Sequence, residues 1–226
     1  GMIDGIVLGT PQIEVLDVLK GKLPLVLLDV SPSPVTRGIP LIGTDMSTGM
    51  VEALCGAREM GYRKCAVLTS PPTDPNLLIQ PALRSELRIL PQQCGLEIPD
   101  GMDMVDPISS ATHEQVVMKI AQRLIEPIKS KKIDLILAEH NGYLETLLPV
   151  LAEHGIHVPD DVGMIGVSCF NSSRKKSNFA CIATNWGKMV PLCLEILVSM
   201  IEKHKEFSDV NLVAPLIFLE GTVRRK

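Results

Sequence analysis

The sequence lacks any long block of basic residues. Its 226 residues carry 22 Lys and Arg against 26 Asp and Glu, which gives a formal net charge of −4. The nearest approaches to a basic cluster are Arg174-Lys175-Lys176 and Arg224-Arg225-Lys226, and runs this short are typical of a solvated surface. Proteins that grip a nucleic-acid backbone use clustered Lys and Arg, so we do not expect this chain itself to bind DNA.

Long apolar runs are missing too. No apolar stretch is long enough to cross a bilayer. The first residues, Gly1 to Gly9, lack the basic start and the extended apolar segment of a secretory signal peptide. The sequence therefore predicts a cytoplasmic protein with no membrane partner.

Motifs for metals, cofactors and catalysis are absent as well. The six cysteines (55, 65, 94, 169, 181 and 193) lie inside apolar runs without C-x-x-C or Cys/His metal spacing, so we expect buried, reduced thiols. Neither a G-x-G-x-x-G nor a G-x-S-x-G motif nor a P-loop occurs. We therefore predict no catalytic residue, no metal and no cofactor.

What the sequence does contain is a regular alternation of short apolar runs with helical patterns. The predicted strands are 3–8, 23–30, 39–43, 65–69, 102–105, 134–138, 162–167, 179–183 and 210–218. The predicted helices are 13–19, 48–60, 83–94, 112–129, 143–153 and 189–203. Uniformly apolar strands that alternate with helices indicate an α/β fold whose parallel sheets are covered by helices on both faces.

Parallel sheets bind ligands where their strands end, at the carboxyl edge. The residues that directly follow the apolar runs are therefore the candidates to line a site: Thr10, Ser31, Thr44, Asp45, Ser70, Glu139 to Asn141, and Ser168 to Asn171.

Several segments, in order along the chain, resemble one family. GIHVPDDVGMIGV (155–167) resembles the G-I-x-V-P-x-D-V-x-x-x-G-F segment of the LacI/GalR transcription regulators. Residues 42–68 are similar to the family pattern V-x-x-D-x-x-x-G-x-x-x-A-x-x-x-L-x-x-x-G-H-x-x-I, with Tyr62 where the family usually has His. IDGIVLG and PLVLLDV near the start, and Ile182-Ala183-Thr184 with the helix after it, resemble further family segments.

The resemblance implies a two-lobed, periplasmic-binding-protein-like type I fold with the effector in a cleft between the lobes. The chain would cross between lobes three times. One lobe would hold residues 1–44 and 186–207, and the other 45–185 and 208–226. Family members begin with a DNA-binding domain and two strand–helix units that this sequence lacks, so the first lobe would be partial. Either this chain is a shortened form of the protein, or the natural protein lacks those elements.

The resemblance also suggests effector contacts at the ends of strands. Arg84 falls, after a one-residue shift, where the family's R-x-x-G-F motif supplies an arginine to sugar hydroxyls, and its planar fork of donors suits vicinal oxygens. An exposed helix arginine is the alternative. Glu139 and His140 replace the family's Asn-Asp, and Glu139 either accepts hydrogen bonds from hydroxyls or only favours a helix N-terminus.

Four further positions complete the expected site. Ser168 stands where the family's G-F-D motif has a ligand-binding aspartate, and that departure suggests a different ligand or a sensor that no longer binds sugar. Asn171 could substitute for that aspartate or be a plain turn residue. Asp45 either contacts the effector or caps the following helix. Trp186, the sole tryptophan, either stacks on a sugar ring or fills a core.

Taken together, these patterns predict the effector-sensing domain of a bacterial transcription regulator, acting as a homodimer. Its effector would be a small carbohydrate or a related polar metabolite. DNA would be contacted only through a domain outside this chain. Because Asn185-Trp186 also looks like sensing domains fused to winged-helix readers, that domain could be of the helix-turn-helix or the winged-helix type. The alternatives are a solute-binding protein of a sugar transporter and, from another class, an α/β enzyme.

Overall fold

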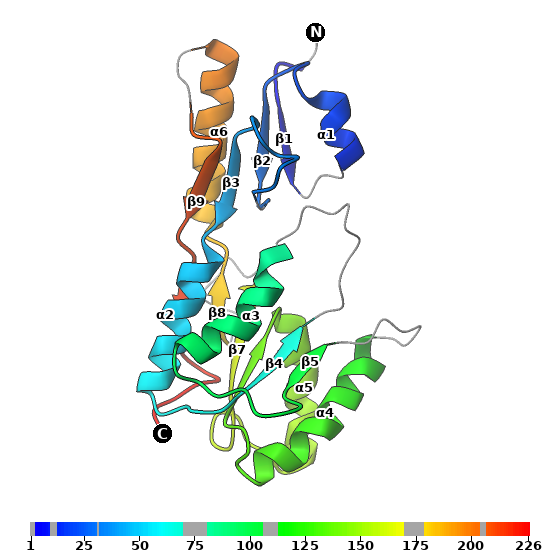
Figure 1. Ribbon diagram of the computed structural model, residues 1–226, viewed down its shortest axis with the longest axis vertical. Coiled ribbons are helices and arrows are strands. Elements are labelled where there is room, and N and C mark those ends of the chain that lie inside the picture. The colour runs from blue at the N-terminus through cyan, green and yellow to red at the C-terminus, as the bar shows by residue number, and fades with distance from the viewer. Residues whose placement is uncertain are drawn as a thin grey trace. The chain divides into compact units, whose positions relative to one another are not determined.

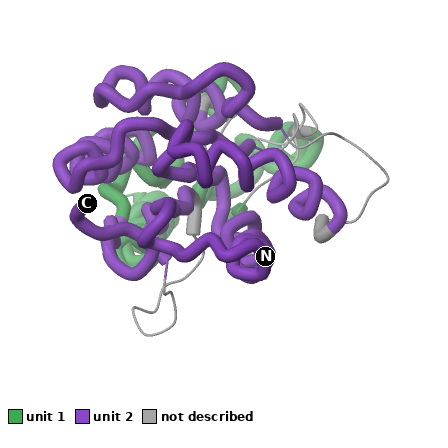
Figure 2. The backbone as a smooth tube through the Cα atoms, turned by 90° about the horizontal axis from the view of Figure 1, so that it is seen from below, with its two compact units in different colours: residues 1–45, 72–81, 185–215 green, residues 46–71, 82–184, 216–226 purple. Residues whose placement is uncertain are grey.

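The computed structural model describes residues 3–9, 13–30, 32–69, 81–105, 113–169, 179–203 and 207–226. These residues form two compact units (Figure 2). The first unit consists mainly of Gly1–Asp45 and Asn185–Pro215, and the second of Met46–Pro71, Ala82–Thr184 and Leu216–Lys226. Among the described helices, none has the length and apolar character needed to cross a membrane.

The first unit is a parallel four-stranded sheet between two helices (Figure 1). Its elements are β1 (Ile6–Gly9), α1 (Ile13–Leu19), β2 (Leu25–Leu28), β3 (Leu41–Thr44), α6 (Trp186–Glu202) and β9 (Val210–Val213), with strand order β1-β2-β3-β9. Successive side chains of β2 point to opposite faces. Leu25 and Leu27 pack with Leu16 of α1, whereas Val26 packs with Met189 and its neighbours on α6.

The second unit is built on a six-stranded sheet with strand order β10-β8-β7-β6-β4-β5. Its strands are β4 (Cys65–Thr69), β5 (Asp103–Val105), β6 (Leu135–Ala138), β7 (Gly163–Cys169), β8 (Ala180–Ala183) and β10 (Leu216–Phe218). Its helices are α2 (Met46–Glu59), α3 (Pro81–Gln93), α4 (His113–Lys129) and α5 (Asn141–Glu153). All neighbouring strands run parallel except β10, which is antiparallel to β8.

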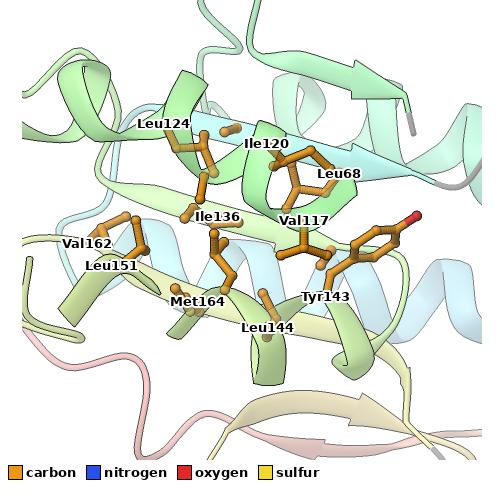
Figure 3. Packing of buried hydrophobic residues seen from close by; sticks show 14 of the residues in the cluster. Leu68, Val117, Ile120, Leu124, Ile136, Tyr143, Leu144, Leu151, Val162 and Met164 are labelled. Carbon is orange, nitrogen blue, oxygen red and sulfur yellow. The ribbon is translucent and has the colours of Figure 1, made fainter. Parts of the chain in front are cut away.

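In the second unit, side chains again point alternately to the two faces of the sheet, and they divide the core into two clusters. Leu68, Ile136 and Met164 face α4 and α5, where Val117 and Leu144 meet them (Figure 3). The intervening strand residues form the other cluster, with side chains of α2 and α3. Because both faces of the central strands are covered, each strand is apolar along its whole length.

One prediction about the end of the chain is wrong. The predicted single strand 210–218 is two strands, and Pro215, which has no N–H to donate, lies between them. β9 pairs with β3 of the first sheet and β10 with β8 of the second. Residues 208–215 therefore belong to the first unit, although the resemblance implied that they belong to the second.

The cysteines also differ from expectation. Cys65, Cys181 and Cys193 are buried, as predicted, but Cys55 is exposed and Cys94 is only half-buried. The apolar neighbours of Cys55 in the sequence point inward from α2, and the cysteine itself lies on another face of that helix.

Candidate functional site

Two of the predicted site residues meet at the carboxyl edge of the second sheet. Glu139 directly follows β6, and its N–H donates to the carbonyl of Leu68 in β4 at 2.9 Å. Arg84 lies in the first turn of α3, the helix that follows β4. The Arg84 Nε donates to Glu139 Oε1 at 3.3 Å. Arg84 and Glu139, 55 positions apart in the sequence, therefore form an ion pair at the carboxyl end of β6.

This ion pair is largely shielded from water. The side chains of Arg84 and Glu139 are 22% and 15% exposed. A second arginine of α3, Arg88, pairs with Asp103 at 2.9 Å, but those side chains are 41% and 42% exposed. Exposed pairs contribute little because water screens them. Arg84 and Glu139 thus differ from the ordinary surface pair one helical turn away.

The chemistry of the pair suits an oxygen-rich ligand. A guanidinium has five N–H donors in a rigid fork, and the contact with Glu139 uses one of them. A carboxylate offers only acceptors. Side by side, the two groups can donate to and accept from hydroxyls on neighbouring carbon atoms.

A third polar residue at this edge was not predicted. Thr69 is the last residue of β4 and is 1% exposed. Its Oγ1 is buried without a hydrogen-bond partner among the described residues. Buried hydroxyls are almost always hydrogen-bonded, so such an atom is a candidate contact for a ligand. Thr69 ends an otherwise apolar run, so the sequence pattern assigns it to the strand and points only to the residue after it, Ser70.

His140 and Tyr143 contact each other just beyond Glu139. Their rings stack with centroids 4.3 Å apart and planes at 26°. His140 precedes α5 in extended conformation and makes no side-chain cap bond. Gly142 allows this packing, since a Cβ there would come within 3.0 Å of His140 Nδ1. No group of three or more His, Cys, Asp or Glu suited to a metal ion occurs within the described ranges.

In the first unit, Asp29 is a further candidate that was not among the predicted site residues. Asp29 follows β2 with a positive φ of 59°. Its N–H donates to the carbonyl of Ile42, while its Oδ1 is buried without a partner in the described part of the chain. Burial raises the pKa of this carboxyl above its ordinary value. A strained backbone and an unpaired buried carboxylate oxygen together mark a candidate functional residue.

Asp45 and Trp186 also belong to the first unit or its boundary. Asp45 ends that unit, and its N–H donates to the carbonyl of Val213 at 2.9 Å. Trp186 is the first residue of α6 and is half-buried. The N-cap before it, Asn185, is 9% exposed.

The last two predicted site residues, Ser168 and Asn171, fall partly or wholly outside the described part of the chain. Ser168 lies in β7, and its side chain falls outside the described part of the structure. Asn171 lies outside the described residues altogether. Of the six expected positions, the structure brings Arg84 and Glu139 into contact.

No protein-family model matches the sequence, and no curated protein matches it. The structure, in contrast, closely resembles solved regulators. The probable maltose operon transcriptional repressor MalR of Staphylococcus aureus matches with a TM-score of 0.76 and 14% identity, over 100% of this chain and 77% of its own. A LacI transcriptional regulator from Lactobacillus brevis matches with a TM-score of 0.72 and 20% identity, over 95% and 78% of the two chains.

A third such structure is a LacI-family transcriptional regulator from Enterococcus faecium, solved with bound ribose. It matches with a TM-score of 0.70 and 17% identity, over 99% of this chain and 81% of its own. This chain has the fold of the LacI-family regulators. The predicted fold class is thereby confirmed, and this chain spans 77–81% of the length of these three neighbours.

Proposed function

We propose that this chain is the effector-sensing domain of a transcription regulator and that it binds a small sugar or a related polar metabolite. The observation that carries the proposal is the shielded Arg84–Glu139 pair at the carboxyl edge of the second sheet. In parallel α/β folds, ligands bind at this edge. The bound ribose in the Enterococcus faecium regulator supports a carbohydrate as the ligand class.

Arg84 and Glu139 would change partners when the sugar binds. Each group satisfies part of the other's hydrogen-bonding capacity at 3.3 Å, a long contact for a charge-assisted bond. A diol could accept from the guanidinium and donate to the carboxylate in place of that contact. Asp29, Asp45, Thr69, Ser168, Asn171 and Trp186 are proposed as further contacts.

DNA binding would reside in a domain outside these residues. The formal net charge of −4 does not favour contacts with the phosphates of DNA. Occupancy of the effector site would reach the DNA reader, of helix-turn-helix or winged-helix type, through a shift between two conformations of the sensing domain. The protein would act in the cytoplasm, where free thiols such as Cys55 are ordinary.

We further propose that the sensing domain forms a homodimer through α6. Along this helix, Val190, Leu194, Val198 and Ile201 are 38–51% exposed and form a single stripe. The buried residues Met189, Cys193 and Ile196 occupy the adjoining face. At about 100° per residue, these apolar residues together span about 200° of the helix circumference. A surface helix needs a far narrower stripe, so α6 is suited to burial on two sides.

The test of the proposed function is a thermal-shift screen against a library of sugars. A ligand that prefers the folded state raises the melting temperature. We expect at least one sugar to do so, and the shift to be lost in Arg84→Ala. Arg88→Ala is the matched control, because Arg88 lies one turn along α3 in an exposed pair. A shift that survives Arg84→Ala, or that Arg88→Ala abolishes equally, would refute the assignment.

A further inference from the structure

Two cysteines that the proposed function does not use lie together on the second unit. Cys55 is on α2 and exposed, and Cys94 directly follows α3 and is half-buried. The Cys94 Sγ donates to the carbonyl of Val51 at 3.8 Å. The next residue, Gly95, accepts a hydrogen bond at its carbonyl from Arg58 Nε at 3.1 Å.

These two contacts place Cys94 opposite Cys55. Val51, Cys55 and Arg58 stand four and three residues apart, so they share one face of α2. Cys94 contacts Val51 and Gly95 contacts Arg58, so residues 94 and 95 lie along that face of α2. The pKa of Cys94 is raised to about 11, first by burial and then by a hydrogen bond with the neighbouring Cys55 thiol and by the charge of that group.

The other described cysteines have no comparable setting. Cys65, Cys181 and Cys193 are at most 1% exposed. Because these side chains have almost no contact with solvent, a dissolved oxidant cannot reach their sulfur atoms. Among the described thiols, only the pair on α2 and α3 combines proximity with access to solvent.

We propose that Cys55 and Cys94 form a reversible disulfide when the protein meets a peroxide. The exposed Cys55 reacts first: its sulfur attacks one peroxide oxygen, the O–O bond breaks, and a sulfenic acid and one water result. The Cys94 sulfur then attacks the Cys55 sulfur, and the hydroxyl leaves with the Cys94 proton as a second water. The two thiols lose two electrons and two protons, and hydrogen peroxide becomes two waters. A thiol such as dithiothreitol reverses the bond by exchange.

The bridge would fasten α2 to the end of α3, the helix that carries Arg84. The two helices are already joined nearer their starts, where the Ser47 hydroxyl donates to Glu86 Oε1 at 2.6 Å. An effect of oxidation on effector binding would follow from the position of Arg84. That consequence rests on the proposed function, whereas the bridge itself does not.

The test is disulfide mapping of the folded, reduced protein after treatment with hydrogen peroxide. Remaining thiols are alkylated in denaturant and the protein is digested with trypsin. Cys55 and Cys94 fall in separate predicted tryptic peptides, 38–58 and 89–119, each with one cysteine. We expect these two peptides to be joined and the number of alkylated cysteines to fall from six to four. Dithiothreitol should restore all six.

Three variants serve as controls. Cys94→Ser should abolish the joined peptide and leave Cys55 as a sulfenic acid that dimedone traps. Cys55→Ser should abolish the joined peptide as well. Cys65→Ser removes a buried thiol and should leave the crosslink intact. The proposal is overturned if peroxide yields only unlinked oxidised Cys55 in the unmodified protein, or if other cysteine pairs are joined as often as this one.

Discussion

Asp29 combines two features that cost stability at a single residue. Its backbone adopts a positive φ of 59°, a region that non-glycine residues rarely occupy, although Asp and Asn tolerate it best. Its buried Oδ1 has no hydrogen-bond partner within the described ranges. A residue kept at such a cost at the carboxyl end of a parallel strand is a candidate for ligand contact.

We therefore predict that Asp29→Asn stabilises the folded domain at neutral pH. Burial raises the pKa of the carboxyl, so its contribution to stability is complete below its unfolded pKa of about 3.9 and is lost as the pH rises through the folded pKa. Asparagine keeps the shape and tolerates the backbone angle without ionising. The melting temperature of the variant should exceed that of the parent at pH 7, and the two should converge near pH 4.

The control is Asp17→Asn, on the exposed face of α1. It should change the melting temperature little at any pH in this range. If Asp29→Asn were destabilising at pH 7, the carboxylate would be held by favourable contacts, and its role as a strained ligand residue would be wrong.

Position 163 requires glycine because the side chain of Tyr62 packs directly against it. A Cβ at this position would lie 2.6–2.7 Å from two ring carbons and the hydroxyl oxygen of Tyr62. Tyr62 cannot withdraw, because it is fully buried and its hydroxyl accepts a hydrogen bond from the Arg224 N–H at 3.1 Å. Tyr62 thus serves as a packing residue against the first residue of β7.

Gly163→Ala should consequently destabilise the domain by about 1–3 kcal/mol, the usual cost of overpacking a core. Urea denaturation measures the change. Gly9→Ala is the matched control, since Gly9 is also a strand glycine but its added Cβ would meet only the Leu28 carbonyl oxygen, at 3.7 Å. Equal stability losses in the two variants would contradict this account of the Tyr62 contact.

At this scale, the sequence predicted the site only in part. The resemblance suggested Arg84 and Glu139, whose side chains form an ion pair in the structure, and their contact with a ligand stays a prediction. It did not locate Thr69 or Asp29, because a polar residue at the end of an apolar run looks like a part of the strand. The proximity of Cys55 and Cys94 depends on how α2 and α3 pack, and no local pattern encodes that.

At the scale of elements, the apolar periodicity placed almost every helix and strand. The helix 13–19 and the strand 65–69 agree with the structure residue for residue, and other bounds differ by a few positions. The exception is the segment 210–218, whose halves pair with different sheets. Both halves are apolar enough for a strand, so only the tertiary pairing reveals that the chain changes sheet at Pro215.

The exposed apolar stripe of α6 can be tested as a dimer surface by changing one residue. If its exposed stripe is a dimer surface, Leu194→Glu should place a charge in the interface and weaken dimerisation at least about tenfold. Sedimentation velocity at several concentrations measures the shift from dimer to monomer. Glu195→Gln, on the polar side of the same helix, should leave the dimer unchanged. A parent protein that is monomeric at high concentration would contradict the proposed dimer.

At the scale of the whole molecule, this chain shares its fold with proteins that share few of its residues. The three solved regulators share only 14–20% of residues with this chain and yet match it over at least 95% of its length. Packing requires apolar residues of suitable size at core positions, and many sequences meet that requirement. Function needs specific side chains at the edges of the sheets, so it has to be argued from the site itself.

The central claim is that a sugar binds at the Arg84–Glu139 pair. A crystal structure of the protein with the strongest sugar from the thermal-shift screen tests it most directly. We predict sugar hydroxyls within about 3.2 Å of both the Arg84 guanidinium and the Glu139 carboxylate. A sugar bound elsewhere, with the contact between those two side chains unchanged, would contradict the claim.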